Sequence, residues 1–176
     1  MTVLTGILYP LSINIVGQYL FPEKATGSIL FKNNQPVGSA LLSQKFERPI
    51  YFWPRPSSVD FNPIPSGATN LGPTSADLKK KVDERRSKMG RDAPQDLLTA
   101  SGSGLDPHIS PQAAYFQAGR VTSARNMGPD GEKRVFSLID SFTEKRDFGV
   151  LGEPRVNVLE LNLALDKAVE KRNDGR

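Results

Sequence analysis

The sequence predicts an α+β protein in which one N-terminal transmembrane helix, residues 1–22, precedes a single soluble domain, residues 23–176. That domain is expected to hold a small antiparallel sheet and about four helices. Three observations lead to this prediction. The opening segment has no charged side chain, two β-favouring runs flank an Asn-Asn pair, and later segments place apolar residues with helical spacing.

The composition suits one modest domain with an appended element, since the chain has 176 residues and 38% of them are hydrophobic. Charges of both signs are interspersed and sum to +4, so we expect a solvated surface and no nucleic-acid binding. The absence of cysteine excludes disulfides, thiolate metal ligands and thiol nucleophiles. Because His108 is the one histidine, we expect no metal site.

Residues 1–22 read MTVLTGILYPLSINIVGQYLFP, which is long enough for a membrane span of about 20 mostly apolar residues. A signal peptide would need a basic start and a cleavage site, and a buried soluble helix would show a polar stripe. We therefore expect a span, shortened at its N-terminus. Asn14 and Gln18 lie one helical turn apart, so we expect them to form a face that contacts a protein neighbour in the membrane.

The soluble domain is expected to begin with a β-hairpin and an extended aromatic segment. Residues 27–32 and 35–42 are β-favouring runs joined by the two-residue turn Asn33-Asn34. Residues 46–56 carry three consecutive aromatic residues between prolines, and we expect them to anchor this segment in the core. A surface that binds a partner is the alternative. An irregular loop over 57–74 follows.

Helical spacing dominates the rest of the chain. Ser75 and Ser110 are suitable N-caps, and Pro111 suits the first position of a helix. The last segment reads as a short strand followed by a helix. The predicted elements are helices over 75–91, 95–98, 111–125 and 132–145, a strand over 156–159 and a helix over 161–169.

A Gly/Ser loop, Ser101-Gly102-Ser103-Gly104, precedes the helix that begins at Ser110-Pro111. Such a loop gathers backbone N–H groups near the positive end of a helix dipole and could hold an anion. A structural turn that lets two elements pack closely is the alternative, and the lysine of a P-loop is missing.

A hydrolase using Ser103 and His108, with Asp106 as orienting acid, is the remaining enzymatic hypothesis. The loop lacks the Gly-x-Ser-x-Gly pattern of a nucleophile elbow, and nearness in sequence does not make a triad. We expect Asp106 and His108 to stabilise the turn through nearby backbone groups, and we expect no catalytic residue.

The order of several long motifs identifies a family. The chain resembles the C subunit of Kdp-type potassium-transporting ATPases from Thr2 to about Lys167, and one small departure is Ala68, where family members often carry glycine. The matching motifs are TVLTGILYP, GSILFKNNQPVGSALLSQKF, YFWPRPSS, SGATNLGP, LLTASGSGLDPHISPQAA, RVTSAR and LGEPRVNVLELNLALD.

The resemblance implies a non-catalytic subunit of a membrane complex that imports potassium at the expense of ATP. Its implied partners are a channel-like potassium-binding subunit, a P-type ATPase subunit and a small single-span peptide. The implied location is the cell (inner) membrane, with the N-terminus inside and the soluble domain on the extracytoplasmic side. No tightly bound cofactor is implied.

The resemblance also implies a catalytic chaperone that raises the affinity of the ATPase subunit for ATP, in a ternary complex. The residues implied to contact nucleotide are Ser101, Gly102, Ser103, Gly104 and Gln117. A loop on the outer face cannot touch ATP held by a cytoplasmic domain, because a hydrophilic domain does not cross a bilayer reversibly. We therefore prefer a structural mechanism, in which the span packs on the potassium-binding subunit and the outer domain steadies the ion entrance.

Overall fold

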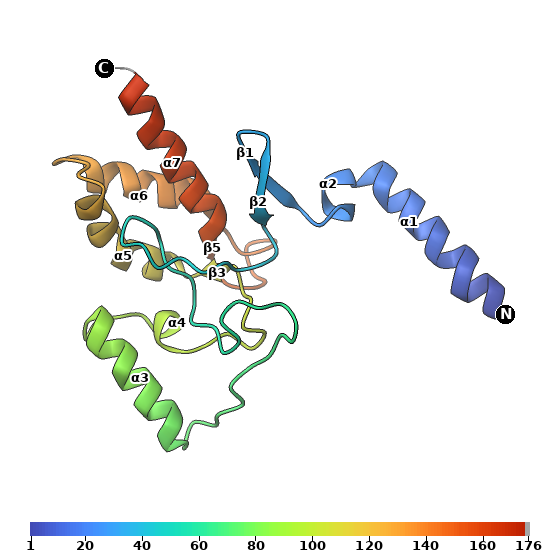
Figure 1. The fold of residues 1–176 in the computed structure, drawn as a ribbon, viewed down its shortest axis with the longest axis horizontal. Coiled ribbons are helices and arrows are strands. Elements are labelled where there is room, and N and C mark those ends of the chain that lie inside the picture. The colour runs from blue at the N-terminus through green and yellow to red at the C-terminus, as the bar shows by residue number, and fades with distance from the viewer. Residues whose placement is uncertain (175–176) are drawn as a thin grey trace. The chain divides into compact units, whose positions relative to one another are not determined.

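A computed structural model of the chain describes residues 1–174, with side chains described through residue 169 (Figure 1). The chain divides into two compact units, one covering Met1–Leu41 and the other beginning at Leu42. Within the described residues the protein is α+β, with seven α-helices, one π-helical turn and two small antiparallel sheets. The α+β part of the prediction is thus confirmed, whereas the described residues form two small sheets instead of one and more helices than the four expected.

The N-terminal unit opens with three short helical pieces instead of one long helix: the π-helix η1 (Leu4–Leu8), α1 (Tyr9–Leu20) and α2 (Pro22–Ala25). The first division lies beside Pro10, whose missing N–H interrupts the α-helical ladder. No helix among the described residues is both long and apolar enough to cross a membrane. The structure therefore does not confirm the span predicted over 1–22.

The predicted hairpin is present as β1 (Ile29–Lys32) and β2 (Gln35–Ser39), which pair antiparallel. Asn33 and Asn34 both have positive φ, at 50° and 64°, as a two-residue turn matched to strand twist requires. Asparagine tolerates this conformation better than most residues, so the local sequence alone specifies the turn.

A three-stranded sheet lies in the second unit, in the order β3 (His108–Ile109), β5 (Arg155–Asn157), β4 (Thr143–Glu144). This sheet corrects two predicted boundaries. The helix predicted over 132–145 is α6 (Gly131–Phe142), which ends earlier because Thr143 and Glu144 pair with β5. The predicted strand at 156–159 begins at Arg155 and ends at Asn157.

The remaining helices are α3 (Ala76–Met89), α4 (Gln95–Leu98), α5 (Pro111–Ala124) and α7 (Val158–Asp174). The Oγ atoms of Ser75 and Ser110 accept hydrogen bonds from the third residue on, which confirms both predicted N-caps. α7 begins earlier than residue 161 because Asn157 Oδ1 accepts from Leu159 N at 3.1 Å and from Glu160 N at 3.2 Å.

The core of the second unit joins α5, α6 and α7 to the sheet and to the aromatic segment. In Figure 1, β3 and β5 lie between α6 and α7 on one side and α3 and α4 on the other. Phe52 has no exposed surface, so the predicted core anchoring of the aromatic segment is confirmed for this residue. It packs in one cluster with Leu97, Ile109, Ala113, Ala114, Ala118, Val121, Met127, Val135, Ile139, Val156, Val158, Leu161 and Leu165.

Candidate functional site

The Gly/Ser loop packs against the irregular loop that precedes α3. Ser103 O accepts from Gly67 N at 3.0 Å, and Ser101 N donates to Pro56 O at 3.2 Å. Gly104 has φ +72°, and a Cβ there would lie 2.8 Å from Val59 Cγ2 and 2.9 Å from Gly67 O. The glycine is therefore required by close backbone approach within the chain itself.

Two of the four residues of this loop are buried and two are exposed. Ser101 is 3% exposed, and its carbonyl accepts from Gly104 N at 3.3 Å. Gly104 is also buried, whereas Gly102 and Ser103 are exposed. Of the four loop residues expected to contact nucleotide, Gly102 and Ser103 present the surface. The geometry accounts for a structural turn, and anion binding by the loop stays a prediction.

Gln117, the fifth predicted nucleotide contact, is 3% exposed on α5 and engages the aromatic segment. Its Oε1 accepts from Trp53 N at 2.8 Å, and its Nε2 donates to Trp53 O at 3.1 Å. The same Oε1 accepts from Arg120 at 2.6 Å. These bonds use the donor and acceptor groups of the side chain internally, and they do not bring Gln117 to the Gly/Ser loop.

Asn162 on α7 repeats this arrangement one residue earlier along the aromatic segment. Its Oδ1 accepts from Phe52 N at 2.8 Å, and its Nδ2 donates to Phe52 O at 3.0 Å. Side-chain amides from two helices thus take the place of neighbouring strands, and they satisfy backbone groups that would be costly to bury unpaired. Asn162 was not among the residues predicted from the sequence, although an asparagine among the leucines of LELNLALD was the available signal.

Two arginines of α5 and the loop after it complete the docking of this segment. Arg120 donates to the carbonyls of Pro49 and Tyr51, at 2.6 and 3.0 Å, and stacks 3.8 Å from the centre of the Trp53 ring. Burial lowers the pKa of Arg120 to about 10, which leaves it charged at neutral pH. Its positive charge therefore remains available to the ring and the carbonyls.

Arg125 forms the second anchor. Its Nε donates to Ile50 O at 2.7 Å, and its guanidinium lies 2.8 Å from Asp166 Oδ1. The side chains of Arg125 and Asp166 are 8% and 15% exposed. Tyr51 donates its hydroxyl to the other oxygen of Asp166 at 3.3 Å. A mostly buried ion pair thus joins α7 to the aromatic segment.

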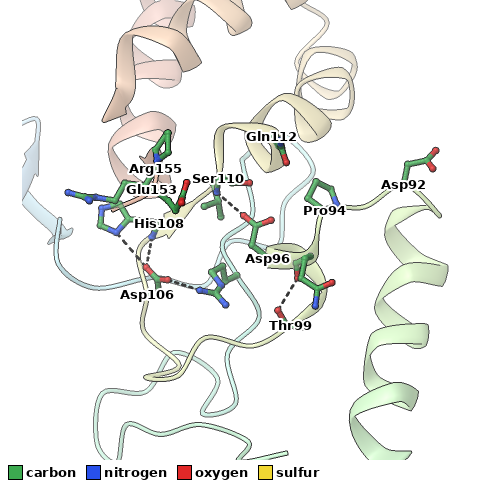
Figure 2. Close-up of a pocket in the computed structure, with 14 residues that line it drawn as sticks. Asp92, Pro94, Asp96, Thr99, Asp106, His108, Ser110, Gln112, Glu153 and Arg155 are labelled. Atoms are coloured by element: carbon green, nitrogen blue, oxygen red, sulfur yellow. Dashed lines mark hydrogen bonds and ion pairs between the residues drawn. The ribbon is translucent and has the colours of Figure 1, made fainter. Parts of the chain in front are cut away.

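A polar depression of about 730 Å³ lies beside the segment, between the start of α4, the start of α5 and the approach to β5 (Figure 2). Asp96 Oδ2 accepts from Ser110 N at 2.7 Å, so one wall ties α4 to the N-cap of α5. The depression is lined by Arg55, Asp92, Pro94, Gln95, Asp96, Thr99, Asp106, His108, Ile109, Ser110, Gln112, Glu153, Pro154 and Arg155.

Asp106 is the most heavily bonded acid in this depression. Its carboxylate accepts from His108 N and Arg55 Nη1, both at 3.0 Å, and His108 Nδ1 lies 3.5 Å away. Burial raises the pKa of Asp106, but the bonds from His108 and Arg55 outweigh it and hold the pKa below its ordinary value. The predicted stabilisation of the turn by Asp106 is confirmed.

The same bonds bear on the hydrolase hypothesis. Ser103 Oγ accepts from Leu105 N at 3.1 Å, in a local turn, while the His108 ring faces Asp106. Among the described contacts the serine and the histidine are not brought together as nucleophile and base.

In the N-terminal unit, Gln18 Nε2 donates to Asn14 Oδ1 at 3.0 Å. The predicted shared face of these two residues is therefore present on α1. Its contact with a membrane partner stays a prediction.

The fold and the contacts define a small α+β domain whose polar residues mainly hold an extended segment in place, joined to an exposed apolar helical unit. The chain belongs to the KdpC family, because the model of that family, described as "K+-transporting ATPase, c chain", matches residues 1–167. It is therefore a component of the potassium-transporting Kdp complex.

Curated relatives named as KdpC subunits align with this chain over nearly their whole length. The potassium-transporting ATPase KdpC subunit of Burkholderia orbicola strain MC0-3 is 48% identical, covering 96% of this chain and 91% of the relative. The KdpC subunit of Cereibacter sphaeroides is 46% identical with the same coverage. That of Methylococcus capsulatus is 48% identical and covers 94% of this chain and 90% of its own.

Proposed function

We propose that this chain is a non-catalytic accessory subunit that assembles and stabilises the potassium-importing complex. The observation that carries the proposal is the internal use of its candidate site residues. Gln117 and Asn162 hold the aromatic segment, and Gly104 lets two loops pack. Side chains committed in this way build a rigid surface for partner subunits rather than a reaction centre.

The apolar segment Met1–Pro22 lies in the membrane against a partner subunit. Every residue of this segment is exposed within the structure except Gly17, which is half-buried, and none is charged. Such a surface requires an apolar environment that the segment itself does not supply. The bonded pair Asn14 and Gln18 supports a protein neighbour, since polar groups within a bilayer associate with other helices.

The soluble domain predicted over residues 23–176 lies on the extracytoplasmic side, next to the channel-like potassium-binding subunit, and the N-terminus lies inside. On this arrangement the Gly/Ser loop does not contact ATP, and the chain influences the ATP affinity of the P-type ATPase subunit indirectly. The burial of Ser101, Gly104 and Gln117 supports an indirect influence, because three of the five residues implied to contact nucleotide are not at the surface.

A single cysteine tests this placement, because the chain has none of its own. Gly102→Cys suits the purpose, since a Cβ there meets nothing within 4 Å. The complex is expressed in cells, which are treated with a membrane-impermeant maleimide before or after lysis. Labelling in intact cells is expected. Labelling only after lysis would place the loop inside and favour direct nucleotide contact.

Assembly is tested with a chain truncated after Leu41, which removes the second compact unit and keeps the first. Co-expression with the partner subunits is expected to give less complex, or a complex with weaker potassium uptake, than the full chain. Isothermal titration calorimetry of the full chain with ATP tests the remaining hypothesis, which is that this chain binds ATP directly. Tight ATP binding without any partner would overturn the indirect role.

A further inference from the structure

An apolar turn projects from the segment between β4 and β5. Phe148 is 95% exposed, Val150 is 75% exposed and Leu151 is 60% exposed. We call these three side chains the Phe148 tip. They form no part of the core of the second unit, so they do not contribute to the packing that holds that unit together.

Backbone hydrogen bonds close this tip into a turn. Asp147 N donates to Leu151 O and Leu151 N donates to Asp147 O, both at 2.9 Å. Gly149 N donates to Arg146 O at 3.0 Å. Phe148 itself has φ +53°, a left-handed conformation that is unfavourable for a bulky side chain. Such strain is retained where the surrounding bonds impose it, and it is concentrated at binding sites.

Charges at the base of the tip are balanced. Arg146 pairs with Glu153, and Arg155 pairs with Glu144, each at 2.7 Å. Residues 144–155 contain three acidic and three basic side chains, so the net charge of this stretch is zero. A loop that binds an anionic membrane surface carries a basic surplus, which is missing here. The balanced charges at the base suit a pocket whose rim carries no net charge. The three apolar side chains of the tip suit an apolar interior of that pocket.

We propose that the Phe148 tip inserts into an apolar pocket of a partner subunit of the transport complex. This inference rests on the proposed assembly function and names a contact that carries it. An aromatic side chain on a hydrogen-bonded turn has few torsions to restrict on binding, which is typical of the few residues that dominate an interface. The flanking Val150 and Leu151 exclude water around it.

The first test compares variants within the full complex. The complex is captured through a tag on the ATPase subunit, and the retained amount of this chain is measured after washing. We expect Phe148→Asp to lower retention at least about tenfold and Phe148→Trp to keep it within about twofold. Ile64→Asp is the matched control, because Ile64 is 81% exposed on another loop. Equal retention of Phe148→Asp and Ile64→Asp would overturn the proposal.

Thermal unfolding of each purified chain separates docking from folding. The tip is outside the core, so Phe148→Asp is expected to melt within about 2 °C of the unaltered chain. Poor retention together with a much lower melting temperature would assign a structural role to Phe148 and overturn the proposal. Failure of the unaltered chain itself to remain in the complex would instead count against the proposed function.

The second test identifies what covers the tip. Val150→Cys is labelled with an environment-sensitive fluorophore and assembled with its partners in vesicles that contain nitroxide lipids. Shielding from aqueous iodide that requires the partners, without quenching by nitroxide, is expected. Quenching by nitroxide would assign the tip to the bilayer. Shielding in the chain alone would assign it to the N-terminal unit, and exposure to iodide in the complex would leave it uncovered. Each of these three results overturns the proposal.

Discussion

Gln117 pairs with Trp53 as a strand would, with one side-chain atom accepting from the tryptophan N–H and another donating to its carbonyl. The two residues are 64 positions apart in the chain. A segment bounded by prolines cannot easily join a sheet ladder, because proline lacks the N–H that the ladder needs. Here the side-chain amides of Gln117 and Asn162 supply the hydrogen-bond partners that a neighbouring strand would otherwise provide.

Replacing Gln117 by leucine keeps its approximate size and removes both bonds to Trp53. The backbone N–H and carbonyl of Trp53 are then left without these partners, so we expect the free energy of unfolding to fall by about 2–4 kcal/mol. Urea unfolding of the purified chain measures it. Gln112→Leu, at an exposed position of the same helix, is the control and should change stability by less than about 0.5 kcal/mol. Similar losses in both variants would contradict the role assigned to Gln117.

The ion pair between Arg125 and Asp166 should behave as a buried one. Removing one partner leaves the other charge uncompensated, so Asp166→Asn is expected to cost about 3–5 kcal/mol. The double variant with Arg125→Met should lose less than the sum of the two single losses. A double-mutant cycle by urea unfolding gives the coupling energy, and additive losses would show that the pair does not interact in solution.

The lowered pKa of Asp106 predicts that the free energy of unfolding depends on pH. Its pKa in the folded protein lies below the ordinary value of 3.8, so the unfolded chain binds its proton more readily. The stabilisation by this carboxylate is therefore fully present above about pH 5 and is lost as the pH falls through the folded pKa. Urea unfolding of the unaltered chain and of Asp106→Asn is measured at pH 7 and at pH 3. The difference between their free energies of unfolding should be smaller at pH 3. A difference that does not change with pH would contradict the bonds from Arg55 and His108.

Local sequence was sufficient where a structure depends on neighbouring residues. Ser75 and Ser110 start helices by bonding groups three residues on, and Asn33-Asn34 makes its turn from its own backbone preferences. Strand β3 could not be foreseen in this way. It has two residues and exists because β5, some 50 residues later, pairs with it.

In the candidate site, too, features set by neighbouring residues were predictable and features set by distant residues were not. The Gly/Ser loop was recognisable as a turn, but its partner surface at Val59 and Gly67 depends on a loop without periodicity. The contact of Gln117 with nucleotide, implied by the family resemblance, stays a prediction, and the bond of its amide to Trp53 is set by tertiary packing. Buried polar residues on apolar helices are therefore better taken first as partners of the main chain.

The two glycines of the Gly/Ser loop allow its structural and nucleotide roles to be separated. Gly104→Ala places a Cβ 2.8 Å from Val59 and 2.9 Å from a carbonyl, at φ +72°, so we expect a loss of about 1–3 kcal/mol. Gly102→Ala meets nothing within 4 Å and should leave the free energy of unfolding within about 0.5 kcal/mol.

The ATP dependence of potassium uptake by the assembled complex then distinguishes the two roles. Under the structural role, Gly102→Ala leaves the apparent affinity for ATP unchanged, and Gly104→Ala lowers the amount of stable complex. A clear loss of ATP affinity in the stably folded Gly102→Ala complex would instead indicate that the exposed part of the loop approaches nucleotide. Because Gly102 and Ser103 are the exposed members of the loop, direct contact of the loop with nucleotide would fall on this pair.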